Sequence, residues 1–379
     1  MIPFNRPFLT GNEGVNINAS LASRKLSGDG EFTKKCQAFF ASKFGFQHNL
    51  LTTSCTDALE MCAILLNLQP GDEVILPSFT FVSTANAFAL RGARLVFADS
   101  QADNPNIDPA DIERLITPRT KAIVLVHYAG VACDMDRILE ISNHYKIPVV
   151  EDAAQAIASF HRGRPLGSLG ALSAFSFHET KNIVCGEGGL LVANSADFAH
   201  RAEIIREKGT NRSSFFRGEV DKYGWVDIGS SFLPSDMLAA FLFAQLESIE
   251  EIQAERVRVW EQYATLLAEG AQRGWYSLPV VPDYATNNAH MFYLVCRNLD
   301  ERTRLIAHLK NAGIHAVFHY ISLHSSPYYA AEHGSRALPN SDRYTDCLVR
   351  LPLFPELTNE QLKFIASEIH SFYAGSCNS

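Results

Sequence analysis

Residues 149–155 have the sequence Val-Val-Glu-Asp-Ala-Ala-Gln, in which two apolar residues are followed by two carboxylates and then by small residues. The apolar pair belongs to the β-rich run Pro148–Glu151. Short runs of this kind are typical of strands that are covered on both faces of a sheet. The stretch therefore predicts a buried strand with Asp152 at its carboxyl end.

The same pattern recurs outward from this stretch through the first 250 residues. β-Rich runs alternate with amphipathic segments such as Thr56–Leu68, whose apolar residues recur at helical spacing. Alternating strands and helices predict an α/β fold, in which helices cover a mostly parallel sheet. We expect seven strands, at His48–Thr53, Glu73–Ser78, Arg94–Asp99, Lys121–His127, Pro148–Glu151, Leu172–Phe177 and Gly189–Asn194.

The pattern changes near residue 236. Ser235–Tyr263 predicts one long helix or two joined helices, and a smaller α+β unit follows it. We place the boundary at residue 250, which gives a large domain (1–250) and a small C-terminal domain (251–379). The stretch Leu323–Tyr344 is the least regular, and we expect a mobile loop there. The other expected elements of the small domain are strands at Ala289–Val295 and His315–Tyr320, a helix at Glu301–Ala312 and a terminal helix from Asn359.

The composition argues against several classes of protein. The chain has 379 residues and a net charge of −8, so we expect no attraction of its whole surface to nucleic acid or to a membrane. It has no run near the roughly 18 apolar residues of a membrane span, and no continuous apolar stretch at its N-terminus. The eight cysteines form no C-x-x-C pair and show no metal-ligand spacing, so we interpret them as reduced thiols of a cytoplasmic protein without a metal site.

Four segments lie at the ends of predicted strands, where ligands bind in open α/β sheets. In Thr53–Glu60, small hydroxyl residues begin a helix, whose free N–H groups can bind an anion; alternatively, Ser54 is an ordinary helix N-cap. In Pro77–Thr84, an aromatic ring can lie flat on a planar heterocycle, or both Phe79 and Phe81 can be core residues.

The other two segments contain a carboxylate and a lysine. Asp152 is costly to bury without a cation such as a protonated pyridine nitrogen, unless it caps the next helix. Lys181 lies in a polar loop before the turn Gly186–Gly189, where it can form a Schiff base with an aldehyde or be a surface lysine. Together the four segments provide a phosphate site, a stacking ring, an acid for a ring nitrogen and an aldehyde-binding amine. These are the parts of a pyridoxal 5'-phosphate (PLP) site.

The sequence resembles the DegT family of nucleotide-sugar aminotransferases over nearly its whole length, from residue 2 to residue 354. The resemblance implies an aspartate aminotransferase-like fold (fold type I), PLP as the cofactor and a homodimer with its active sites at the interface. The most specific matches are PSFTFVSTANAF (77–88), VVEDAAQA (149–156), FSFHETKN (175–182) and GEGG (186–189).

The resemblance also implies a role for each cofactor-binding residue. Lys181 holds the cofactor covalently and then transfers protons, while Asp152 pairs with the pyridine nitrogen. Gln155 binds the ring hydroxyl, and Phe81 stacks on the ring. The phosphate is held by Ser54, Cys55, Thr56 and Ser176.

One segment departs from the family pattern G-x-N-x-R-M, in which the Asn reaches the phosphate bound by the partner subunit. In residues 229–234 (GSSFLP), Ser231 occupies the position of that Asn and Leu233 occupies the position of the Arg. Because Ser231 retains one hydrogen-bond donor, we expect it to take the place of the Asn at the partner's cofactor.

Within the family, four segments resemble members that aminate C4 of a dTDP-linked 4-keto-6-deoxy sugar to a galacto product: HYAGVACDMD (127–136), REKGTNRSSFFRG (206–218), VDKY (220–223) and VFHYISLH (317–324). The family resemblance also implies L-glutamate as the amino donor. Seven polar residues in these segments are candidate contacts of the nucleotide diphosphate and the keto sugar, and each is equally an ordinary packing or surface residue. They are His127, Lys208, Arg212, Arg217, His319, Tyr320 and His324.

Three other interpretations remain open. A dehydratase of similar fold has a histidine in place of the lysine, and Lys181 argues against it. A PLP-binding regulator without turnover is opposed by the single enzyme-like unit with no added DNA-binding segment. Amination at C3, or a gluco product, is opposed only by the closer resemblance. The residues alone do not determine the configuration of the product or the amino donor. They also do not determine whether the nucleotide of the sugar substrate is dTDP or UDP.

Overall fold

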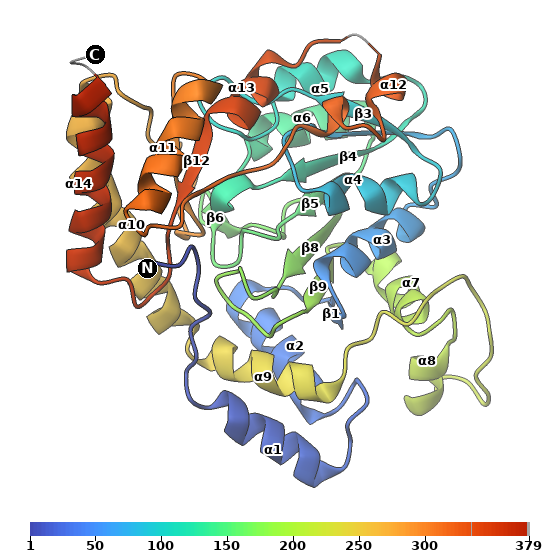
Figure 1. Ribbon diagram of the computed structural model, residues 1–379. Helices are drawn as coiled ribbons and strands as arrows, with labels where there is room; N and C mark the ends of the chain where they lie inside the picture. Colours follow the sequence, from blue (N-terminus) through green and yellow to red (C-terminus); the bar gives the residue numbers. More distant parts are fainter. Residues whose placement is uncertain (335, 377–379) are drawn as a thin grey trace.

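The centre of the structure is a seven-stranded sheet (Figure 1). The computed structural model describes residues 1–334 and 336–376. The strands are β1 (Asn49–Thr52), β2 (Glu73–Pro77), β3 (Arg94–Ala98), β4 (Thr120–Val126), β5 (Val149–Asp152), β8 (Leu172–Ser176) and β9 (Gly189–Ala193). Their order is β1-β9-β8-β5-β4-β2-β3; β8, β5, β4, β2 and β3 are parallel, whereas β9 is antiparallel to both of its neighbours. The seven expected strands and the mostly parallel α/β sheet are confirmed.

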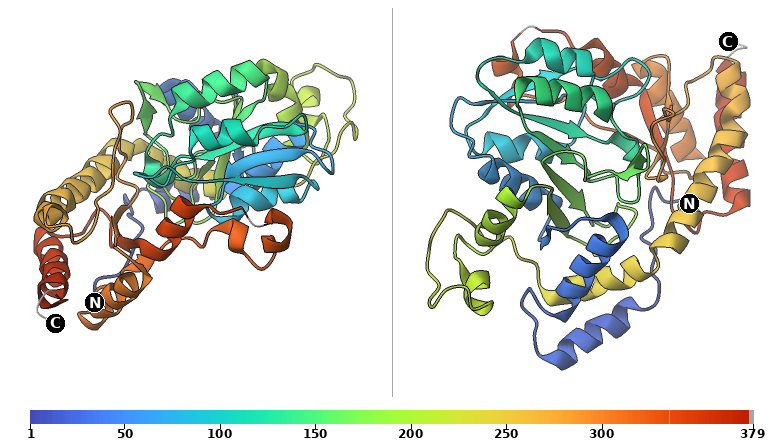
Figure 2. Two further views of the ribbon diagram at one scale, coloured as in Figure 1. Left: turned by 90° about the horizontal axis from the view of Figure 1, so that it is seen from above. Right: turned by 180° about the vertical axis from the view of Figure 1, so that it is seen from behind.

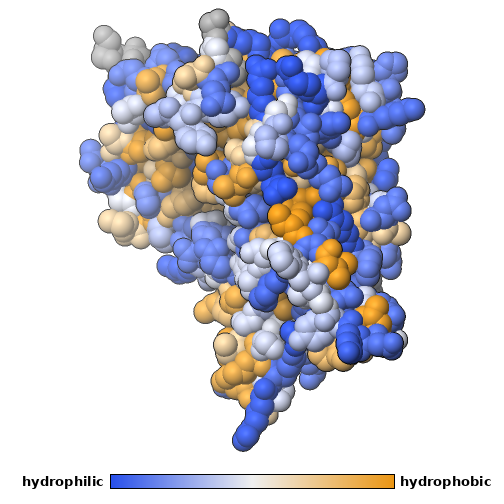
Figure 3. All heavy atoms as spheres, turned by 90° about the vertical axis from the view of Figure 1, so that its right-hand side faces the viewer, coloured by the Kyte–Doolittle hydropathy of each residue, from blue (hydrophilic) through white to orange (hydrophobic). Residues whose placement is uncertain are grey.

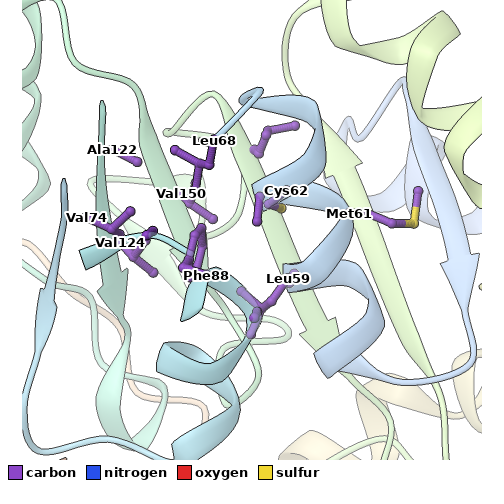
Figure 4. Close-up of a cluster of buried hydrophobic side chains, with 14 of the residues drawn as sticks. Leu59, Met61, Cys62, Leu68, Val74, Phe88, Ala122, Val124 and Val150 are labelled. Atoms are coloured by element: carbon purple, nitrogen blue, oxygen red, sulfur yellow. The ribbon is translucent and has the colours of Figure 1, made fainter. Parts of the chain in front are cut away.

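Helices cover both faces of this sheet. The helices of this part of the chain are α1 (Glu13–Ser23), α2 (Glu31–Phe44), α3 (Cys55–Leu65), α4 (Val82–Ala89), α5 (Pro109–Leu115), α6 (Met135–Tyr145), α7 (Ala196–Arg206), α8 (Arg212–Phe216) and α9 (Asp236–Glu247). Successive strand residues point to opposite faces. Val150 therefore packs in a cluster with residues of α3 and α4, whereas Val149 packs with residues of α5 and α6. Figure 4 shows the first cluster, in which Phe88 of α4 lies beside Val124 and Val150.

Short elements join the strands of the main sheet. They are η1 (Tyr128–Gly130) and the hairpin of β6 (Phe160–His161) and β7 (Arg164–Pro165). Ala129 within η1 has a positive φ of 58°, so the chain turns sharply there just after β4. This turn follows the carboxyl end of β4, beside the end of β5 that contains Asp152.

The C-terminal unit has its own antiparallel sheet and its own apolar core. Its strands are β10 (Phe292–Val295), β11 (Val317–Phe318) and β12 (Leu348–Leu351), in the order β10-β12-β11, and its main helices are α10 (Ile249–Gln272), α11 (Leu299–Asn311) and α14 (Asn359–Ser376). Figure 2 shows α10 and α14 together at one side of the main sheet. Ser248 separates α9 from α10, so two joined helices form where one or two were expected. We propose residue 250, next to this break, as the domain boundary. The N-terminus nevertheless contacts the C-terminal unit, because Ile2 forms a parallel β-bridge with Ile314.

The expectation of a loop at residues 323–344 is wrong. This stretch contains η2 (Leu323–Ser325), α12 (Ala330–His333) and the start of α13 (Pro339–Cys347), while Ser335 lies outside the described residues. The hydroxyl of Tyr329 accepts a hydrogen bond of 2.6 Å from the backbone N–H of Leu95, which ties the stretch to β3. The polar composition of α13 conceals its helical face, because only Ser341, Tyr344 and Cys347 are buried.

Two further expectations concern the whole chain. Among the described residues, no helix combines the length and the apolar character that crossing a membrane requires. Seven cysteines are described and all seven are free thiols. Cys377 lies outside the described residues.

Candidate active site

A cavity of about 590 Å³ opens at the carboxyl ends of the parallel strands and is also lined by the C-terminal unit. Its position agrees with the general rule that open α/β sheets bind ligands at this edge. Ten residues expected from the sequence line it: Ser54, Cys55, Thr56, Phe81, Asp152, Gln155, Ser176, Lys181, His319 and Tyr320.

Lys181 follows β8 in a turn, where the backbone N–H of Lys181 donates a hydrogen bond to the carbonyl of His178 at 2.9 Å. Burial lowers the pKa of the Lys181 amine below its usual range. The amine forms no hydrogen bond or ion pair with any residue in the described part of the chain. A lysine with a lowered pKa and a free amine suits nucleophilic attack on an aldehyde.

Asp152 ends β5, and its side chain is only 4% exposed. Its carboxylate accepts hydrogen bonds from the Thr84 hydroxyl at 2.7 Å and from the backbone N–H of Ala154 at 3.1 Å. Burial raises the pKa of Asp152, and no described residue forms an ion pair with it. A buried carboxylate without a cationic partner is costly. The site therefore favours a ligand that presents a cation to Asp152.

The start of α3 and Ser176 also line the cavity. Ser54 is the N-cap of α3 and accepts from the N–H of Asp57 at 3.1 Å, so the ordinary capping interpretation is confirmed. Cys55 and Thr56 form the first turn and line the cavity, as an anion site requires. Gly189 permits this arrangement, because a Cβ there would lie 2.4 Å from the backbone of Ser54.

The two aromatic residues after β2 have different environments. Phe79 is 1% exposed and belongs to the core, whereas Phe81 is 56% exposed and lines the cavity, where it can contact a planar ring. Gln155 also lines the cavity; its amide oxygen accepts from the N–H of Ala129 at 2.6 Å, and its amide nitrogen donates to the Tyr320 hydroxyl at 3.0 Å.

The candidate substrate residues separate into groups. His319 and Tyr320 line the cavity, and His319 Nδ1 is 2.7 Å from the Tyr128 hydroxyl. His324 does not line the cavity; its Nδ1 lies 2.7 Å from the Ser78 hydroxyl. We withdraw His127 as a substrate contact because it is fully buried, with its Nε2 2.9 Å from Glu151.

Four other candidates lie outside the cavity, in the segment that follows α7. Lys208 and Ser231 are exposed, and Arg212 stacks on the ring of Phe216 at 5.1 Å. Arg217 pairs with Glu203 at 2.9 Å and with Glu219. The segment projects from the body of the molecule (Figures 1 and 2). Within one chain, therefore, none of the four contacts the site.

The structure adds residues that sequence reasoning missed. His290 and Arg350 come from the C-terminal unit, and His178, Thr84 and Glu187 also line the cavity. His290 Nδ1 lies 2.9 Å from the amide oxygen of Asn182, the residue after Lys181. Burial lowers the pKa of His290, so its ring is neutral near pH 7.

The profile of the DegT/DnrJ/EryC1/StrS aminotransferase family matches residues 9–370. The chain belongs to this aminotransferase family. The family expected from the sequence is thereby confirmed.

Solved structures of other aminotransferases share the fold. TlmJ from Streptoalloteichus hindustanus is 29% identical, with a TM-score of 0.91 and 100% of both chains covered. DesV from S. venezuelae is 30% identical, with a TM-score of 0.89 and 98% of both chains covered. Spr1654 from Streptococcus pneumoniae, solved in its PLP form, has the same fold at 24% identity, with a TM-score of 0.90 and 99% of both chains covered.

This aminotransferase is an enzyme that uses PLP and acts on sugars. The residues of the cavity fit the cofactor, because a free amine and a carboxylate without a cation face the same space. Lys181 would hold it at the aldehyde, Asp152 at the ring nitrogen and the first turn of α3 at the phosphate. The family assignment argues against the alternative interpretation that the chain is a PLP-binding regulator without turnover.

Proposed function

We propose that Lys181 and Asp152 are the catalytic residues of this aminotransferase. The observation that supports this most directly is that both side chains line one cavity at the carboxyl ends of β5 and β8. PLP, when bound, supplies the aldehyde that accepts an amino group and a ring that delocalises electrons. Asp152 keeps the ring nitrogen protonated, because a nearby negative charge raises the pKa of a cation. Lys181, tethered beside the reacting carbons, acts as acid or base without diffusing.

The proposed substrates are dTDP-4-keto-6-deoxy-D-glucose and L-glutamate, and the proposed product is dTDP-4-amino-4,6-dideoxy-D-galactose. The resemblance in residues 206–223 and 317–324 supports this choice, and residues 319 and 320 of the second segment line the cavity. The enzyme would then be a dTDP-4-amino-4,6-dideoxygalactose transaminase of enterobacterial common antigen synthesis. The same amino sugar would suit a lipopolysaccharide O-antigen.

The configuration of the product depends on which face of the sugar lies toward Lys181. A proton delivered by this lysine reaches one face only, because the lysine is tethered to the chain and lines the cavity. Binding of the nucleotide, far from the reacting carbon, sets the orientation of the sugar. The galacto product therefore requires that the sugar present the corresponding face to Lys181.

Proton NMR of the product tests this assignment. We expect incubation with dTDP-4-keto-6-deoxy-D-glucose and L-glutamate to give an axial amine at C4, with small H3–H4 and H4–H5 couplings. Large couplings would indicate the gluco epimer, and an amine at C3 would indicate a 3-keto substrate. Either result would contradict the specific substrate while leaving the family unchanged.

We also propose that the enzyme is a homodimer with composite active sites. The segment that contains Ser231 leaves large side chains exposed, including Phe216 at 69% and Trp225 at 84%. Figure 3 shows the side of the molecule on which this segment lies, with apolar groups at its surface among hydrophilic ones. Exposed apolar groups of this kind are typical of surfaces that a partner covers. A second copy at this surface would receive Ser231 at its cofactor phosphate.

Mixing two inactive variants tests the composite site. Lys181→Ala removes the amine, and Ser231→Asp places a negative charge beside the partner's phosphate. In a mixed dimer, one site has both Lys181 and Ser231. Random association of equal amounts should restore about a quarter of the wild-type activity, because half of the dimers are mixed and each has one intact site. Each variant alone is the control, and a monomer with full activity by sedimentation would refute the proposal.

A cytoplasmic location completes the proposed function. The seven described cysteines are free, and the six of them that are buried fit a protein that keeps its thiols reduced.

A further inference from the structure

His290 is a buried side chain of the active-site cavity that the mechanism above does not use. It lies two residues before β10 and is 4% exposed. Its Nδ1 atom is 2.9 Å from the amide oxygen of Asn182, the residue after Lys181. Its Nε2 atom has no hydrogen-bond partner among the described residues. The two nitrogens of this ring therefore have different environments.

The orientation of the Asn182 amide is fixed by its other partners. Its Nδ2 atom donates to the carbonyl of Asn288 at 2.8 Å and to Oε1 of Gln253 at 2.9 Å. A backbone carbonyl can only accept, so the amide nitrogen of Asn182 must face Asn288 and its oxygen must face His290. Gln253 supports this orientation, because its own Nε2 donates to the carbonyl of Asn288 at 3.2 Å and its oxygen is left for Asn182.

This orientation determines which nitrogen of His290 carries the proton. The oxygen of Asn182 is an acceptor only, so Nδ1 of His290 must be the donor. Burial lowers the pKa of His290, so the ring is neutral near pH 7. Three cations act in the same direction, namely Lys181, Arg350 and Arg256. A neutral ring with its proton on Nδ1 has an Nε2 atom that can accept a hydrogen bond but cannot donate one.

The amine of Lys181 is a hydrogen-bond donor without a partner in the same cavity. Its positive charge acts on the His290 ring, so the two side chains are neighbours. A lysine has a flexible four-carbon stem and can turn its amine toward a nearby acceptor. Asn182 directly follows Lys181 in the chain, so the residue that orients the ring also fixes the backbone beside the lysine.

We propose that Asn182 and His290 are positioning residues for Lys181. Asn182 keeps the proton on Nδ1 of His290, and Nε2 then accepts a hydrogen bond from the Lys181 amine whenever this amine is not bound to the cofactor. This bond stabilises the ammonium form of the lysine, because a hydrogen bond to a charged form favours that form. It also directs the amine to one place while it transfers protons. The inference rests on the proposed role of Lys181.

Two substitutions of His290 separate its two nitrogens. In His290→Asn, the amide nitrogen can replace Nδ1 as the donor to Asn182, but no atom replaces Nε2. In His290→Gln, the longer side chain can place its amide oxygen near the position of Nε2 as an acceptor, while the donor to Asn182 is lost.

The pKa of Lys181 is measured in enzyme loaded with pyridoxamine 5'-phosphate, in which the lysine is not bound to the cofactor. We expect this pKa to fall by about 1 or more in His290→Asn, as loss of a hydrogen bond to a charged group predicts, and to change by less than about 0.3 in His290→Gln. The rate at which an amine-specific acylating reagent labels Lys181, followed by mass spectrometry as a function of pH, gives the pKa.

Nitrogen-15 NMR of labelled histidines tests the tautomer in the same form of the enzyme. Wild-type His290 should carry its proton on Nδ1 near pH 7. Asn182→Asp places a negative charge beside Nδ1, which raises the pKa of the ring and should leave both nitrogens protonated at this pH.

Asn49 provides the matched control for Asn182. It is buried and does not line the cavity, and its Nδ2 also donates to two acceptors, the carbonyls of Gln37 and Phe46. Asn49→Asp should lower Tm without changing the NMR signal of His290 or the pKa of Lys181.

Three results would overturn the inference. They are a proton on Nε2 of wild-type His290, an unchanged Lys181 pKa in His290→Asn, and equal falls of this pKa in His290→Asn and His290→Gln. Borohydride label on a lysine other than Lys181 would overturn the proposed function instead.

Discussion

Replacement of Lys181 by alanine is expected to lower kcat by about ten-thousandfold or more, measured as amino sugar formed per enzyme. The variant loses both the covalent attachment of PLP and the acid–base group beside the reacting carbons. Its structure should tolerate the change, because the amine has no hydrogen-bond partner among the described residues. Bound PLP should still be detectable, held at the phosphate and the ring nitrogen.

Two variants control for charge and for a general effect of removing a lysine. Lys181→Arg retains the positive charge but offers no amine of comparable reactivity, so it should be as inactive as Lys181→Ala. Lys310 is an exposed lysine on α11, and Lys310→Ala should retain full activity. Substantial turnover by either Lys181 variant would mean that another group performs the proton transfers.

The second large effect is expected for Asp152→Asn, with a loss in kcat of about a hundredfold or more. Asparagine has nearly the same size: its amide oxygen can still accept from the N–H of Ala154, and its amide nitrogen can donate to the Thr84 hydroxyl, so the variant should fold. It has no negative charge with which to keep the ring nitrogen protonated. The measurement is kcat in enzyme that has been saturated with PLP.

Glu151 provides a matched control in the same strand. It is fully buried outside the cavity, where it accepts from the N–H groups of Gly167, Leu169 and Gly170 and contacts His127. Glu151→Gln should therefore lower Tm but leave kcat nearly unchanged. Near-normal kcat in PLP-saturated Asp152→Asn would show that this carboxylate does not act on the ring nitrogen.

Local sequence patterns predicted the main sheet well because its strands are short apolar runs buried on both faces. Val149 and Val150 pack into clusters on opposite faces, as such a run requires. The carboxyl ends of parallel strands meet at one edge of the sheet. The sequence alone therefore predicts that Asp152 and Lys181 belong to one site, and both line the same cavity. The polar helix α13 was missed because its buried face consists of only three residues.

Residues contributed by distant parts of the chain were harder to predict. His290 and Arg350 lie more than 100 residues after Lys181, and no local pattern distinguishes them from packing residues. His127 was misplaced for the opposite reason. It follows a strand end, as Asp152 does, but its ring turns into the interior toward Glu151 instead of the cavity. Contacts across a dimer interface, such as the one proposed for Ser231, depend on a second copy of the chain.

The most direct test of the account is the identity of the lysine that holds PLP. The purified protein should be yellow, and borohydride reduction should fix the cofactor irreversibly to the chain. Proteolysis and mass spectrometry then locate the modified residue. The account predicts a single labelled peptide that contains Lys181, and no label in Lys181→Ala. Label on any other lysine would contradict the assignment of the active site.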